Sequence, residues 1–215
     1  MGWIDVPAEN DRRDLEALVR RLTAMDEASA MRIVAAGGAL RIWARTPFGP
    51  LATRVVVGTA DAADQVVVAG VLSQSISASD GGRRIDLGFP NPSAWQGMLP
   101  PSGGFEAVEM IGAQEILDLA EKGRGVAADE SGPLGIAPSL LEQEVIAVGG
   151  EDASRLGVEM RLIFALTGLG FVPSRGGTAP AGERVRVASR GPWIRLDARY
   201  GSVFHRPESL PLDVV

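Results

Sequence analysis

The chain has 215 residues, of which 46% are hydrophobic and 22% are charged, as is typical of a globular protein. It has no cysteine and one histidine, His205, so disulfides, iron–sulfur clusters, cysteine-ligated zinc and metal centres with two imidazoles from one chain are excluded. We therefore expect no metal and no cofactor, and we favour a protein that is not an enzyme. The net charge of −6 disfavours non-specific binding to nucleic acid.

The N-terminus and the apolar stretches predict a cytoplasmic protein without a membrane partner. Residues 1 to 7 lack the basic and apolar regions of a signal peptide. The longest apolar stretches, 66 to 72 and 162 to 166, are far shorter than the roughly 18 residues that span a bilayer.

The first predicted element is an amphipathic helix that begins after a cap at Asn10 or Asp11. Its apolar side chains recur at helical spacing, and the charged side chains between them turn to solvent. The buried stripe is predicted to consist of Leu15, Leu18, Val19, Leu22 and Met25.

A β-hairpin is predicted next, with strands over residues 30 to 36 and 39 to 45. The pair Gly37-Gly38 between them suits a two-residue turn, which requires positive φ. This turn fixes the register, so side chains with alternating positions share a face. One face, with Met31, Ile33, Ala35, Leu40, Ile42 and Ala44, is predicted to be core, and the other carries Arg32, Val34, Arg41, Trp43 and Arg45.

Short elements fill the chain up to residue 89. Residues 53 to 57 form a β-branched run, and the alternation of Ile85, Leu87 and Phe89 indicates a strand. Residues 61 to 76 are ambiguous between helix and strand. Their length favours a helix, whereas the triplet at 66 to 68 favours a strand.

Residues 90 to 104 hold four prolines and three glycines, too many for a helix or a central strand. We take this segment as the domain boundary. It predicts an N-terminal α+β subdomain over 1 to 95 and a C-terminal helical subdomain, closed by a β-hairpin, over 96 to 215. The two parts either share one core or form two small subdomains.

The second part is predicted to contain two main helices. One covers 113 to 122 and ends at Gly123, so the G-x-G-x-x-A pattern of 123 to 128 is interpreted as a helix end and not as a dinucleotide fingerprint. The other begins at Asp152 or Ser154 and runs through Leu156 to Leu166 as a buried helix. Further expected elements are a short helix over 138 to 143 and strands over 144 to 148, 184 to 189 and 193 to 199.

These elements predict an α+β fold, in which antiparallel β-hairpins pack with amphipathic helices. Acidic residues at helical spacing, Glu115, Asp118 and Glu121, are interpreted as a solvated helix face and not as a metal or catalytic site. His205 follows the last predicted strand and is expected at the surface or at a sheet edge.

Two arginine-rich strand faces are the only features that indicate a binding site. On the first hairpin Trp43 lies opposite Arg32, an arrangement that in a nucleic-acid protein stacks bases and holds phosphates. A solvated or covered sheet face explains the same pattern without a ligand. The candidate nucleic-acid-binding residues are Arg32, Arg41, Trp43, Arg45, Arg184, Arg186 and Arg195. No catalytic and no metal-ligating residue is assigned.

Two stretches carry a resemblance to other proteins. Leu99-Pro100-Pro101 and Gly104-Phe105-Glu106, together with Trp193-Ile194-Arg195-Leu196 and Tyr200-Gly201-Ser202-Val203, resemble conserved hypothetical proteins of GC-rich actinobacteria. Lys122 is the only lysine among 21 basic residues, which agrees with such a genome. The resemblance implies no activity.

The sequence therefore leaves three functions open. We favour a non-enzymatic cytoplasmic interaction protein that self-associates, as a homodimer with an unknown protein partner, because apolar side chains such as Trp3 and Phe48 fall in predicted loops. A second possibility is a winged-helix-like nucleic-acid-binding module built from the helices at 113 to 122 and 156 to 167 and the hairpin at 184 to 199. A third is an enzyme that acts on a small ligand through carboxylate or arginine chemistry.

Overall fold

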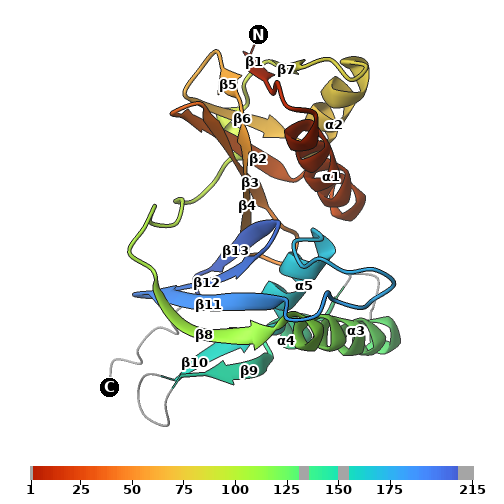
Figure 1. Ribbon diagram of the computed structural model, residues 1–215, viewed down its shortest axis with the longest axis vertical. Coiled ribbons are helices and arrows are strands. Elements are labelled where there is room, and N and C mark those ends of the chain that lie inside the picture. The colour runs from red at the N-terminus through yellow and green to blue at the C-terminus, as the bar shows by residue number, and fades with distance from the viewer. Residues whose placement is uncertain (1, 131–135, 150–154, 208–215) are drawn as a thin grey trace.

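One antiparallel sheet of eight strands runs through both halves of the molecule (Figure 1). The computed structural model describes residues 2–130, 136–149 and 155–207. The order across the sheet is β6 (Asp64–Val68), β2 (Ala30–Ala36), β3 (Ala39–Arg45), β4 (Leu51–Val57), β13 (Gly201–His205), β12 (Trp193–Ala198), β11 (Arg184–Arg190) and β8 (Glu106–Gly112).

Two small sheets lie at the ends of the molecule. The first has three strands in the order β5 (Thr59–Ala60), β1 (Gly2–Asp5) and β7 (Arg84–Gly88), and the second pairs β10 (Leu156–Glu159) with β9 (Glu144–Val148). All these pairs are antiparallel.

The four long helices cover one side of the large sheet, α1 and α2 in one half and α3 and α5 in the other (Figure 1). They are α1 (Glu9–Met25), α2 (Ala69–Ala78), α3 (Ala113–Glu130) and α5 (Met160–Gly168), with short helices α4 (Pro138–Leu141) and η1 (Pro92–Ala94). The core lies between these helices and the sheet, where Leu15, Leu18 and Leu22 of α1 are at most 1% exposed. The predicted α+β class is confirmed.

The order of elements repeats four times along the chain. A strand and a helix are followed by one to four strands: β1 and α1, β6 and α2, β8 and α3, then β10 and α5. In each half the leading strands pair crosswise, β1 with β7 and β6 with β2, then β8 with β11 and β10 with β9. No sequence repeat accompanies this structural repeat.

The two halves meet where β4 pairs with β13. Only three residue pairs form this contact, Leu51 with Phe204, Ala52 with Val203 and Thr53 with Ser202. The sheet is therefore continuous across the junction, although β4 runs on to Val57 beyond the end of β13.

Most local predictions of the first half are confirmed, but helix α1 begins at Glu9 after Ala8, so a cap at Asn10 or Asp11 is wrong. Gly37 and Gly38 have φ of 59° and 80°, and Met31 pairs with Ala44 in the expected register. The face with Ile33 and Ile42 is buried except at Ala35, which is partly buried, because this face packs under α1 and α2. The ambiguous stretch at 61 to 76 divides into strand β6 up to Val68 and helix α2 from Ala69, so a helix over its whole length is wrong.

Three expectations in the second half are wrong. Helix α3 continues through Gly123 to Glu130, so the G-x-G-x-x-A pattern lies inside a helix and does not end one. A Cβ at Gly123 would lie 2.8 Å from the Phe164 ring, so a tight helix contact explains this glycine. Leu156 lies in strand β10, before α5 begins at Met160.

Five strands were not predicted: β1 and β5 in the first half, and β8, β10 and β13 in the half that was expected to be mainly helical. The buried character of α5 is confirmed, since six of its residues are buried. The predicted caps Asp152 and Ser154 lie outside the described residues.

The connector between the halves, residues 89 to 105, crosses the face of the large sheet that points away from the helices (Figure 1). Arg45 of β3 donates a hydrogen bond to the carbonyl of Gln96, and Phe105 packs on Phe204 with ring centroids 5.6 Å apart. The proline- and glycine-rich segment is therefore packed on the sheet.

Candidate functional site

All seven arginine and tryptophan candidates lie on the strands of the large sheet, but most are used for internal contacts. Trp43 is only 5% exposed and packs on Phe204 at a centroid distance of 5.3 Å, so it offers no platform for a base. Arg32 pairs with Asp64, its Nε 2.8 Å from Oδ1, and its guanidinium lies 6.0 Å from the Trp95 ring. The predicted pairing of Arg32 with Trp43 across the hairpin is present.

The second arginine face is also internally paired. Arg184 donates to the carbonyl of Met110 at 2.7 Å. Arg186 and Arg195 both approach the carboxylate of Asp197 at 2.6 Å. Arg195 also lies over the Phe204 ring, 5.1 Å from its centroid. Among the seven candidates the structure brings Arg41 and Arg195 to one hollow at the junction of the halves.

A cleft of about 550 Å³ opens at the other end of the same junction. Its walls come from both halves: Arg45 and Leu51 from β3 and β4, and Trp193 and Phe204 from β12 and β13. The remaining lining residues are Gly49, Glu142, Glu159, Arg161, His205, Arg206 and Pro207. This junction cleft thus combines aromatic side chains with ionisable groups.

Three ionisable side chains are largely buried in the junction cleft. Arg161 Nε lies 2.7 Å from Glu159 Oε2, and His205 Nε2 lies 3.6 Å from the same oxygen. Burial, and then the nearby Arg161, lower the pKa of His205 to about 4. Burial also raises the pKa of Glu159, although Arg161 acts against this. His205 is therefore neutral at pH 7 and forms no ion pair there.

The position of His205 corrects the sequence interpretation, since its side chain is only 11% exposed and belongs to strand β13. Glu159, Arg161 and His205 were all missed as site residues. The charged pair Glu159 and Arg161 within an otherwise apolar stretch was the one available signal.

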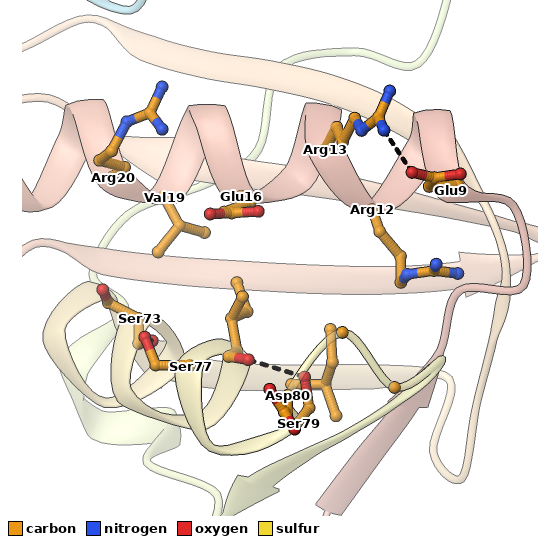
Figure 2. A pocket seen from close by; sticks show the side chains of 14 residues that line it. Glu9, Arg12, Arg13, Glu16, Val19, Arg20, Ser73, Ser77, Ser79 and Asp80 are labelled. Atoms are coloured by element: carbon orange, nitrogen blue, oxygen red, sulfur yellow. Dashed lines mark hydrogen bonds and ion pairs between the residues drawn. The ribbon is translucent and has the colours of Figure 1, made fainter.

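A third concavity, about 460 Å³, lies between α1 and α2 (Figure 2). Its floor is apolar, with Val19 and Ile85, and its walls carry Arg12, Arg13, Arg20 and several serines. Figure 2 shows the guanidinium groups of Arg13 and Arg20 turned away from α2, and Arg13 pairs with Glu9. These side chains do not converge on one point, so this groove is a weaker candidate than the junction.

Two family models match the chain. The model of a domain of unknown function, DUF8010, matches residues 3–97, and that of another, DUF8185, matches residues 100–210. The second match covers more than half of the 215 residues. The chain belongs to the DUF8185 family. No curated protein matches it.

The fold of this DUF8185 protein is similar to that of DNA polymerase sliding clamps. The Caulobacter crescentus clamp matches with a TM-score of 0.60 and 13% identity over 99% of this chain and 67% of the clamp. The Bartonella birtlesii clamp, bound to griselimycin, gives a TM-score of 0.59 and 13% identity over 99% and 66%. A C. crescentus clamp with PEG bound to a putative beta-motif tethering region gives 0.57 and 14% over 98% and 66%.

The clamp fold overturns the functions predicted from sequence for this DUF8185 protein, which spans about two thirds of the length of those clamps. The three predictions were an interaction protein of no known type, a winged-helix-like module and a small-ligand enzyme. None of them described a clamp-like protein. The winged-helix prediction fails for a physical reason, because α5 is buried against the sheet and its first predicted turn is strand β10. None of the described helices has the length and apolar character of a membrane span.

Proposed function

We propose that this protein is a clamp-like platform that holds a segment of a partner protein in the junction cleft. The observation that carries the proposal is that both halves build one cleft at the junction in the middle of a continuous sheet. The likeness to the C. crescentus clamp that holds PEG at a putative beta-motif tethering region supports the same assignment. Clefts at domain junctions are also common binding sites.

The chemistry of the junction cleft defines the segment it accepts. Trp193, Leu51 and Phe204 supply apolar surface for a buried anchor side chain. Arg45 and Arg206 stand at the cleft as cations. We therefore expect an extended segment with one aromatic or aliphatic anchor and an acidic neighbour.

The charge on the helical side of the molecule does not favour binding to duplex DNA. The described side chains of the four long helices include seven acidic and seven basic residues, so they carry no net charge. A surface that holds phosphates without reading sequence needs an excess of positive charge. The clamp fold is therefore proposed to serve protein binding here.

A displayed library of random peptides, panned against the purified protein, tests this function. Selected peptides should lose about tenfold or more in affinity, measured by fluorescence anisotropy, in the Trp193→Ala variant. Trp3→Ala is the matched control, because Trp3 is also half-buried but packs under Arg84 at 4.3 Å, outside the cleft. Equal binding of the selected peptides to Trp193→Ala and wild type would refute the assignment.

Three finer predictions are kept as proposals. The domain boundary lies at residues 95/96, and the protein is cytoplasmic. It forms a homodimer, for which the edge strands β7 and β9 are candidate contacts, since an edge strand presents unpaired backbone groups. Light scattering after size exclusion should then give about twice the 22.5 kDa of the chain.

A further inference from the structure

A second hollow lies where β4 and β13 separate, and it is distinct from the junction cleft. Its volume is about 560 Å³. The pairing of the two strands stops at Thr53 and Ser202, while β4 continues and the turn before β13 bends away. The hollow opens in the gap between them. Its lining is Asp14, Arg41, Thr53, Arg54, Val55, Arg195, Asp197, Ala198, Arg199, Tyr200, Gly201 and Ser202.

Four arginines surround this hollow, and two of them are neutralised by their own partners. Arg54 pairs with Asp14 at 2.5 Å, and Arg199 donates to Glu183 at 3.0 Å. Each pair leaves no net charge, so neither attracts an anion strongly.

The other two arginines leave positive charge uncompensated. Arg195 shares the carboxylate of Asp197 with Arg186, so two guanidinium groups face one negative charge. Ser202 also donates to this carboxylate. Arg41 has no hydrogen-bond or ion-pair partner among the described residues. The hollow therefore carries an excess of two positive charges, although the whole chain is acidic.

The surroundings of Arg41 favour a compact anion. Arg41 pairs with Val55 across β3 and β4, so both side chains share one face, and Val55 is 48% exposed. The ring of Tyr200 is held under Arg54, 5.6 Å from its guanidinium carbon, and flanks the hollow. Guanidinium groups recognise phosphate through paired N–H donors, and this preference exceeds that for a monovalent anion.

We infer that this hollow binds a phosphate group that carries two negative charges, with Arg41 and Arg195 as its principal ligands. The phosphate belongs either to an inorganic phosphate or to a nucleoside phosphate, since both present the same oxygens to the arginines. The inference does not rest on the junction cleft, because the two sites share no lining residue.

Isothermal titration with inorganic phosphate at constant ionic strength tests the site. We expect saturable binding with one site per chain. Arg41→Gln should weaken it about tenfold, because it removes a charge-assisted contact. Val55→Glu should weaken it to a similar extent by adding a negative charge beside Arg41 without removing any arginine. Arg13→Gln is the matched control, since Arg13 is exposed on α1 and paired with Glu9.

A parallel titration with adenosine monophosphate separates the two sources of phosphate. Affinity equal to that of inorganic phosphate assigns recognition to the phosphate alone, and a clearly higher affinity assigns a nucleotide that also contacts Tyr200. Either result supports the site if Arg41→Gln lowers the affinity for the ligand and the variant keeps the melting temperature of wild type. Binding that is unchanged in Arg41→Gln and Val55→Glu, or absent at about 10 mM ligand, would overturn it.

Discussion

The burial of His205 makes the stability of the protein depend on pH. Its pKa is lowered to about 4 in the folded protein, from the ordinary value of 6.5. The folded state therefore binds fewer protons than the unfolded state below pH 6.5. The stability present at neutral pH is lost as the pH falls from about 6.5 towards 4.

The size of the effect follows from the two pKa values. Between pH 7.5 and pH 5 a shift from 6.5 to about 4 lowers the free energy of unfolding by about 2 kcal/mol. Water that reaches the ring screens its charge and reduces this to about 1 to 2 kcal/mol. Glu159 acts in the opposite direction, because its pKa is raised and its protonation at low pH relieves a buried charge.

Urea denaturation at pH 7.5 and pH 5, on wild type and on His205→Asn, measures this contribution. We expect the variant to lose about 1 to 2 kcal/mol less than wild type over the same interval, whatever its stability at pH 7.5. In this comparison, the contribution of carboxylates that titrate in both proteins to the pH dependence of stability cancels. An identical pH dependence in both proteins would show that His205 is not desolvated and would refute the reasoning.

Two further outcomes are expected. Gly125→Ala should stabilise the protein by about 0.5 to 1 kcal/mol in urea, since a Cβ there meets nothing within 4 Å. Gly123→Ala, two positions earlier in α3, should destabilise the protein by about 1 kcal/mol. The new Cβ would lie 2.8 Å from Phe164, and the cost of this clash outweighs the same gain in helix propensity. Equal stabilisation by both changes would contradict the packing described. A 30-base-pair duplex should not shift in a native gel at about 150 mM salt, because the described side chains of the helices carry no excess of positive charge, and a stable complex would contradict our assignment of that face.

The sequence predicted the elements whose signals are local. The Gly37-Gly38 turn sets its hairpin register without help from the rest of the chain, and the leucines of α1 mark their own buried stripe. Strand β8 was missed because its side chains are mostly exposed and do not alternate. The prediction ended helix α3 too early, at Gly123. The cost of this glycine within the helix is offset by close packing against another helix, and only the folded chain shows that packing.

The candidate sites were hard to predict for a related reason. Glu159 and Arg161 come to His205 only because β10, α5 and β13 assemble around the junction, and 45 residues lie between Glu159 and His205. The arginine faces were found by their strand alternation, but their partners, such as Asp64 and Asp197, depend on pairing across the sheet. At 11 to 14% identity the clamp likeness is carried by topology and not by residues.

The fold is similar to that of a clamp, but the described side chains of the helices lack the excess of positive charge that binding to nucleic acid requires. The junction of β4 with β13 builds the same continuous sheet whatever side chains the helices carry, because it depends on backbone pairing and on a small apolar contact. The helix surfaces can change charge without disturbing that sheet, and here their described side chains carry no excess of positive charge. The excess of positive charge lies instead beside the junction, at Arg41 and Arg195, where the two halves meet. A ligand that binds there, as we propose, would contact both halves and so stabilise their mutual arrangement as well as its own site.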